Sequence, residues 1–133
     1  MASYLCDNCI PWQAAEVLVL VKVQACHVKD IRELGTDATD QQIAEWCEQK
    51  EAVWMTVDWK ARKRREVQAI PALAGISIAF FRTPSRSGWT RRQFVQQVLR
   101  RVDAMEKLYD AEYPVWYQFS ERGAPKPVAI PRL

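Results

Sequence analysis

The stretch Ala52-Val53-Trp54-Met55-Thr56-Val57 is a short, mostly apolar run, and Asp58 follows it directly. Its length and its content of β-branched and aromatic residues predict a buried strand. A helix is expected before this strand, over about residues 40–51, and a basic helix or turn after it, over about residues 60–68. A strand between two helices places this part of the chain in the α/β class.

The same alternation of strand-like and helix-like segments extends in both directions along the chain. Strands that alternate with helices predict a parallel sheet covered on both faces, with right-handed crossovers. The further elements expected are strands over residues 3–7, 25–29 and 76–81, helices over residues 11–24 and 89–109, and a final hairpin over residues 115–119 and 128–130.

One domain is expected over residues 1–133, because no internal repeat, linker or low-complexity segment interrupts the chain. We predict a three-layer α/β/α sandwich with a mainly parallel central sheet of about four or five strands, plus a C-terminal helix and hairpin. The core of this domain is expected over about residues 3–82, and the added helix and hairpin over residues 89–133.

The composition is that of a compact soluble domain, with 49% hydrophobic and 26% charged residues in a chain of 133. At this length roughly two thirds of the unfolded surface is buried on folding, so the four cysteines are not needed as disulfides. No apolar run reaches the roughly 20 residues that span a bilayer, and the first residues lack the features of an export signal. We therefore expect a cytoplasmic protein with free thiols.

The charged residues are distributed unevenly. Residues 1–59 hold 4 basic and 10 acidic side chains, whereas residues 60–101 hold 11 basic side chains and one acidic side chain. An acidic part joined to a basic part suits a protein that gathers metal cations with the one and a polyanion with the other. Solvated helix faces with salt bridges between the two halves would give the same pattern, and charge alone does not separate these interpretations.

Three aspartates stand at positions that the predicted topology brings to one rim of the sheet. Asp7 closes the first strand, Asp58 closes the third, and Asp40 stands at the start of the helix that precedes the third strand. Ligand sites of parallel sheets lie at the carboxyl ends of the strands. Because carboxylates repel one another, such a cluster favours a divalent cation, and oxygen ligands select Mg²⁺ or Mn²⁺.

Each of these acids also has a local structural interpretation. Thr39 and Gln42 match a capping box, in which Asp40 only complements the helix dipole. Asp7 and Asp58 would equally serve as turn or helix-capping residues. The spacing alone therefore leaves both interpretations open.

Four short segments within about residues 3–82 carry a more specific signal through their order and spacing. They are Leu5-Cys6-Asp7-Asn8-Cys9-Ile10-Pro11, Cys26-His27-Val28-Lys29-Asp30, Thr39-Asp40-Gln41-Gln42-Ile43 and Met55-Thr56-Val57-Asp58. Together they resemble the PIN-like nuclease domains, especially the VapC-type toxins of prokaryotic toxin–antitoxin pairs. The most specific parts are the Asp-Asn-Cys-Ile-Pro start and the Thr-Val-Asp at the end of the third strand.

The resemblance implies a metal-dependent endoribonuclease in which Asp7, Asp40 and Asp58 are the catalytic, metal-binding acids and Mg²⁺ or Mn²⁺ is the cofactor. It also implies that an antitoxin protein is a partner. Many relatives carry another acid two residues beyond the last aspartate, where this chain has Lys60, so the ligand of a second metal is in doubt. The supporting residues that the resemblance indicates are Asn8 and Thr56, with Asp30 as a substitute ligand.

The basic middle of the chain is predicted to bind RNA phosphates, which sets affinity without reading sequence and makes binding salt-sensitive. Trp59 and Trp89 are candidates for stacking on unpaired bases, although core packing is the commoner role of tryptophan. An acidic antitoxin segment would also be attracted to this stretch. The predicted RNA-binding residues are Lys60, Arg62, Lys63, Arg64, Arg65, Arg82 and Arg86.

Two other functions are considered beside the nuclease. One is a catalytically inactive PIN-like module that binds RNA or protein. The other is a thiol–disulfide oxidoreductase, because Cys6 and Cys9 form a CxxC before a helix. A homodimer is also expected, since six tryptophans and an apolar first helix are more hydrophobic surface than a small monomer readily hides.

Overall fold

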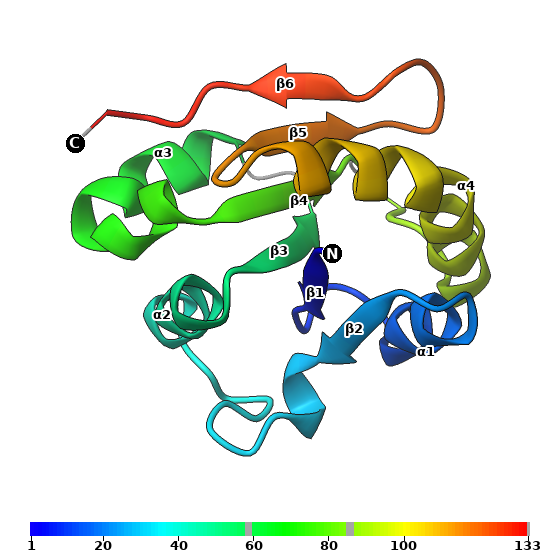
Figure 1. Ribbon diagram of the computed structural model, residues 1–133, viewed down its shortest axis with the longest axis horizontal. Coiled ribbons are helices and arrows are strands. Elements are labelled where there is room, and N and C mark those ends of the chain that lie inside the picture. Colours follow the sequence, from blue (N-terminus) through cyan, green and yellow to red (C-terminus); the bar gives the residue numbers. More distant parts are fainter. Residues whose placement is uncertain (58–59, 85–86, 133) are drawn as a thin grey trace.

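The computed structural model describes residues 1–57, 60–84 and 87–132, with only the backbone of residues 60 and 61. Its centre is a single six-stranded sheet of order β2-β1-β3-β4-β5-β6 (Figure 1). Every neighbouring pair is parallel except β5 and β6, which are antiparallel. The strands are β1 (Ser3–Cys6), β2 (Gln24–His27), β3 (Ala52–Val57), β4 (Ser77–Phe81), β5 (Trp116–Phe119) and β6 (Lys126–Val128).

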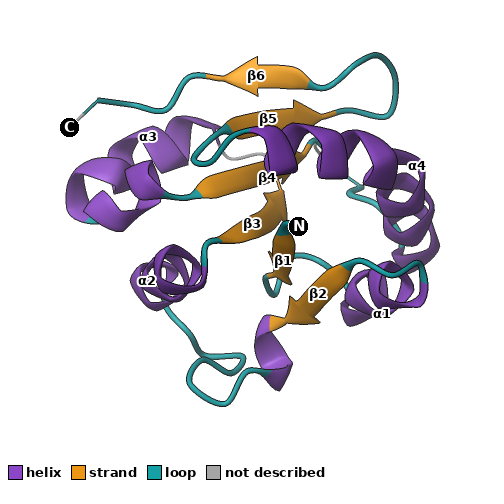
Figure 2. Cartoon of the chain, viewed as in Figure 1, coloured by secondary structure: helices purple, strands orange, loops and turns teal. Residues whose placement is uncertain are grey.

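Helices cover both faces of this sheet within the described ranges (Figure 2). One core contains buried side chains of α1 and α4 and the other contains those of α2 and α3, so these pairs lie on opposite faces. The predicted α/β class with a mostly parallel sheet is confirmed. The helices are α1 (Trp12–Leu20), α2 (Asp40–Lys50), α3 (Lys60–Ala69) and α4 (Arg91–Ala111), and the short 3₁₀ helices are η1 (Val28–Asp30) and η2 (Pro71–Gly75).

The central strand β3 divides its side chains between these two cores. Val53 and Met55 belong to the core on the α1 and α4 side, whereas Trp54 belongs to the core on the α2 and α3 side. Its first five residues are all buried, as expected for a strand with helices on both faces. The range predicted for this strand, Ala52–Val57, is confirmed.

The predicted first helix is longer than the helix in the structure. The sequence pattern indicated a helix over residues 11–24, but α1 ends at Leu20, and Gln24 is already the first residue of β2. Lys22 has a left-handed backbone with φ 69°, which breaks the helix without a glycine. The second strand ends at His27 rather than residue 29, because Val28 starts the short helix η1.

The sheet is wider than the four or five strands expected. The C-terminal hairpin is not an addition to the domain but part of the sheet, since β5 pairs in parallel with β4. Its second strand, β6, covers Lys126–Val128 rather than residues 128–130. Helix α4 likewise packs on the sheet, contributing Phe94, Val98 and Met105 to its core.

The strand order reverses at β1, which lies between β2 and β3. In open parallel sheets this switch point places the carboxyl ends of two neighbouring strands beside diverging loops, where ligands bind. Asp7 follows β1 at this point, and Asp58 is the residue that follows β3 in the sequence. None of the described helices is long and apolar enough to cross a membrane.

Candidate acidic site at the carboxyl ends of the strands

Asp7 is held by two hydrogen bonds directly after β1. Its Oδ1 accepts from the backbone N–H of Cys9 at 2.9 Å, and its Oδ2 accepts from the indole Nε1 of Trp54 at 2.8 Å. Only 4% of the residue is exposed. The Cys9 thiol adds a further hydrogen bond to this carboxylate. A turn and the neighbouring strand β3 together fix the orientation of this acid.

Asp40 is the first residue of α2, and the predicted capping box places it there. The Thr39 hydroxyl accepts from the Gln42 N–H at 3.2 Å, and the Gln42 side chain accepts from the Thr39 N–H at 2.9 Å. Asn8 ties the preceding loop to the β1–α1 turn, since its amide donates to the Thr36 carbonyl at 2.6 Å. The capping interpretation of Asp40 is therefore confirmed, and its role as a metal ligand stays a prediction.

Helix α3 contributes a third acid and two basic groups to this site. The Lys63 ammonium lies 3.4 Å from Asp40 Oδ2 and 3.2 Å from Glu66 Oε2. Arg62 pairs with the same two acids, with its Nη2 3.7 Å from Asp40 Oδ2 and its Nε hydrogen-bonded to Glu66 Oε1. Asp40 and Glu66 are mostly buried, with 24% and 18% of their side chains exposed. The carboxylates are therefore brought together around protein cations.

Trp54 connects Asp7 to this cluster. Its indole N–H donates to Asp7, and its ring lies 4.2 Å from the Lys63 ammonium, within the range of a cation–π interaction. Both Trp54 and the Lys63 side chain are fully buried. One chain of contacts therefore runs from Asp7 through Trp54 and Lys63 to Asp40 and Glu66, across elements far apart in the sequence.

Asp40 of α2 and Glu66 of α3 have opposite shifts of pKa. Burial raises the pKa of Asp40, and a hydrogen bond with the neighbouring Glu66 adds to this rise, while Lys63 acts against it. Burial also acts to raise the pKa of Glu66, but Lys63 and the hydrogen bonds from Lys63, Asp40 and Arg62 hold it below its usual value.

The pKa of the Cys9 thiol reflects the charged groups around it. Desolvation of the thiol raises this pKa to about 12, followed by the charge and hydrogen bond of Asp7, and the charge of Asp40 makes the smallest contribution. Lys63 acts in the opposite direction. Asp7 is therefore the acid that contacts this thiol, and the contacts that join Asp7 to Asp40 pass through Trp54 and Lys63.

Thr56 adds a buried polar atom on this side of the sheet. It lies two residues after Trp54 on β3, so its side chain leaves the strand on the same face. The residue is fully buried, and its Oγ1 has no hydrogen-bond partner among the described residues. An unmet buried hydroxyl costs about 1–3 kcal/mol, which is compatible with the site-orienting role that the resemblance implies.

Several predicted site residues lie outside the described residues. They include Asp58, which is the third predicted metal ligand, as well as Trp59 and Arg86. The side chain of Lys60 is likewise not described. Within the described ranges, no three His, Cys, Asp or Glu side chains form a group that would hold a metal ion. The described part of the site thus supplies two of the three predicted acids.

Two predicted RNA-contacting roles need correction. Lys63 does not present its ammonium to solvent for RNA, because its side chain is fully buried and paired with Asp40 and Glu66. Trp89 does not offer a stacking surface, since it packs edge-on against Phe94 and is only 9% exposed. Exposed basic residues of the predicted set are Arg62, Arg64, Arg65 and Arg82.

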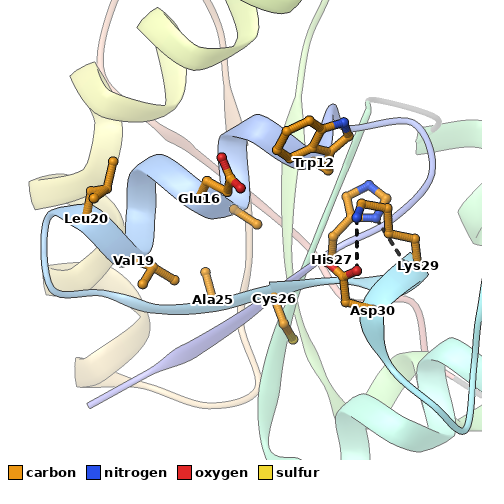
Figure 3. A pocket seen from close by; sticks show the side chains of 10 residues that line it. Trp12, Glu16, Val19, Leu20, Ala25, Cys26, His27, Lys29 and Asp30 are labelled. Atoms are coloured by element: carbon orange, nitrogen blue, oxygen red, sulfur yellow. Dashed lines mark hydrogen bonds and ion pairs between the residues drawn. The ribbon is translucent and has the colours of Figure 1, made fainter.

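Asp30 lies in a different hollow and does not join the described acids. It pairs with Lys29 at 2.9 Å, and both line a cavity of about 540 Å³ between α1 and β2 (Figure 3). His27 lines the same cavity, and its Nε2 is engaged with the Ile10 carbonyl at 2.8 Å. Asp30 thus has its own partner at the edge of the sheet, away from α3.

Both thiols of the CxxC pair have a raised pKa, and Cys6 is also buried, whereas Cys9 is exposed. Cys6 is fully buried against Met55, and burial followed by the charge of Asp7 raises the pKa of its thiol far above its usual value. All four cysteines are free. Reactive thiols need a lowered pKa and access to solvent, so this geometry does not favour disulfide exchange.

Glu66 is the site residue that the sequence prediction missed. It is the one acid in the basic stretch over residues 60–101, and it follows Arg62 and Lys63 by four and three positions. This helical spacing was a usable signal, because such pairs face each other on a helix.

Comparisons of the whole chain with models of known protein families, with curated protein sequences and with solved structures found no match.

Proposed function

We propose that this protein is a metal-dependent endoribonuclease with a PIN-like fold, the toxin of a toxin–antitoxin pair, which hydrolyses RNA phosphodiester bonds. The observation that carries the proposal is the chain of contacts that joins Asp7, beside the switch point of the sheet, to Asp40 through Trp54 and through Lys63 of the basic helix α3. Buried acids at the carboxyl ends of parallel strands are a common arrangement for a catalytic cation site.

The chemistry of the donors fits Mg²⁺ or Mn²⁺, which prefer carboxylate oxygens. Asp7 and Asp58 would hold the ion directly, and Asp40 would hold it directly or through water. The buried Thr56 hydroxyl has no hydrogen-bond partner among the described residues, which supports a further polar group beside it when the site is occupied. In the position of the acid that Lys60 replaces, we propose Glu66 as the further carboxylate, since it already contacts the same cations as Asp40.

When bound, such an ion lowers the pKa of a water molecule and shields the charge of the cleaved phosphate. The chain's own groups prepare the site for it. Trp54 and the Cys9 N–H orient Asp7, while Lys63 holds Asp40 and Glu66 together against their mutual repulsion. The exposed Arg64 and Arg65 contact RNA phosphates in this proposal. An acidic antitoxin segment over α3 would block the same approach.

The test is cleavage of mixed RNA by the purified protein with Mg²⁺ or Mn²⁺, followed by mapping of the new ends. The wild type should cut, whereas Asp7→Asn and Asp58→Asn should reduce cutting to the level of a reaction without protein. Asp103→Asn is the matched control, since it is an exposed aspartate on α4 and should cut like the wild type. A wild type that never cuts RNA with either metal would show that the proposed activity is wrong.

One observation favours a second candidate, an inactive module that binds RNA or protein. The Lys63 ammonium already neutralises Asp40 and Glu66 from a fully buried position. If it substitutes for the metal, Mn²⁺ should raise the melting temperature of the wild type no more than that of an Asp7→Asn, Asp58→Asn double variant. A larger rise in the wild type supports the cation site, because a ligand of the native state stabilises it.

A further inference from the structure

A small cavity opens at the carboxyl ends of β4 and β5. Its volume is about 320 Å³. The strands β1, β3, β4 and β5 are all parallel (Figure 1). The residues that line the cavity follow β4 and β5, as Asp7 follows β1, so the cavity and Asp7 lie at the same, carboxyl ends of the strands. The residues that line it are Arg82, Thr83, Pro84, Ser120, Glu121 and Arg122.

The backbone around this cavity is firmly held. The N–H of Arg82 donates to the Phe119 carbonyl at 2.9 Å, which continues the pairing of β4 with β5. From α4, Arg100 donates to the Glu121 carbonyl at 3.1 Å, and Arg101 donates to the Ser120 carbonyl. These contacts fix the chain on both sides of the cavity before any ligand arrives, so little ordering is needed on binding.

The charges at the cavity favour an anion. Arg82 and Arg122 are both exposed, and neither forms an ion pair with another residue of the described ranges. The carboxylate of Glu121 opposes them, but one of its oxygens accepts from the Trp89 indole at 2.8 Å. Two guanidinium groups against one engaged carboxylate leave a net positive charge, and arginine is the side chain best suited to bind phosphate.

The position of the cavity matches a neighbouring phosphate of a bound strand. From the boundary of β1 and β3 to the boundary of β4 and β5 there are two strand spacings, which is about 10 Å. An RNA strand lying across this edge would therefore pass from the acids to the two arginines within a few nucleotides. The carboxyl ends of the strands would thus carry the acids for cleavage at one place and the positive charges of Arg82 and Arg122 at another.

We propose that Arg82 and Arg122 form a second phosphate-binding site for the RNA strand, which sets how the strand lies across the acidic site. This proposal rests on the proposed nuclease function. It names single-stranded RNA of several nucleotides as the substrate class, because only a strand that extends beyond the cleaved bond reaches both points. Arg122 was not among the residues that the sequence indicated.

The test measures the salt dependence of binding to fluorescein-labelled octauridylate in EDTA, where no cleavage occurs. The variant Arg82→Gln, Arg122→Gln should bind more weakly, and its slope of log Kd against log salt should fall by about 0.7, because one phosphate of the single strand is no longer neutralised. The matched control is Lys50→Gln, Lys107→Gln, which removes two exposed cations near the ends of α2 and α4. These positions lie toward the amino ends of the strands, away from the cavity, so this variant should bind like the wild type.

The length of the substrate gives a second readout. The dinucleotide UpU contains one phosphate and cannot reach both points at once, so the wild type should bind it more weakly than octauridylate. An arginine variant equal to the wild type on octauridylate would overturn the proposal, as would an equal loss in the lysine control. A wild type that binds octauridylate through these arginines but never cuts RNA would refute only the nuclease, and a wild type without affinity for RNA would refute both.

Discussion

At the scale of single residues, Trp54 is the side chain on which the site depends most. It donates to a carboxylate, Asp7, at 2.8 Å and also lies under the Lys63 ammonium. A hydrogen bond to a charged group contributes more than one to a neutral group, about 1.5–3 against about 0.5–1.5 kcal/mol. The chain offers a direct comparison in Trp116, whose indole donates to the neutral Ile76 carbonyl at 3.0 Å.

Trp54→Phe should therefore lower the free energy of unfolding by more than Trp116→Phe, by about 1 kcal/mol. Both changes remove the same atoms from almost fully buried positions, so the loss of packing is similar. Urea denaturation of the two variants and the wild type measures the difference. Equal losses would contradict the importance of the bond to Asp7.

The thiols give a second prediction for single residues. With a pKa of about 12, only about one Cys9 thiol in 10⁴ is ionised at pH 8. Because the thiolate is the reactive form, reaction with a disulfide reagent should be slow at pH 8 and faster as the pH rises toward 12. The measurement is the rate of labelling of native protein, with the unfolded chain as reference. Rapid labelling of Cys9 in the native protein at pH 7 would contradict the raised pKa and favour the redox interpretation.

At the scale of elements, the start of α2 was predicted from the side chains that cap it. The capping box at Thr39 acts on a neighbour three residues away, which a sequence displays. A capping box at Thr90, which was not predicted, begins α4 at Arg91, two residues after the predicted start. The end of α1 was missed because Lys22 stops it with φ 69°. Lysine has no intrinsic preference for this conformation, so only the tertiary packing of the following strand reveals it.

Lys22→Gly should accordingly stabilise the protein by a few tenths to about 1 kcal/mol, since glycine adopts a positive φ without strain. Lys50→Gly is the control, because Lys50 is helical in α2 and the change should destabilise by up to about 1 kcal/mol. Thermal unfolding of both variants checks the opposite signs. A destabilised Lys22→Gly would show that the turn does not carry the expected strain.

At the scale of the whole molecule, the two edges of the sheet differ. The edge strand β6 contains Lys126 and Pro127, which discourage pairing with another strand, whereas β2 has neither a proline nor a charged residue. The expectation of a dimer rested partly on tryptophans, but Trp54, Trp89 and Trp116 are buried. Among the described residues, most of the exposed large apolar side chains lie on α1 and at its end, where Leu20 is 76% exposed.

If the chain dimerises as expected, Val19→Lys, Leu20→Lys should yield a monomer, because it places charges on the most exposed apolar part of α1. Leu99→Lys on α4 is the control and should leave the dimer intact. Size-exclusion chromatography with light scattering gives the masses. A monomeric wild type would show that the expectation of a dimer is wrong.

The sequence by itself determined the class of fold and most of its elements, because apolar periodicity, caps and strand length are local properties. It also indicated that Asp7 follows a strand at the end where parallel sheets bind ligands, and that Asp40 opens a capped helix. Only the tertiary structure decided that β5 and β6 complete the sheet, that the buried Lys63 ammonium lies over the Trp54 ring, and that Glu66 pairs with the same cations as Asp40. These features depend on which segments far apart in the sequence come into contact, and a local sequence pattern does not specify such contacts.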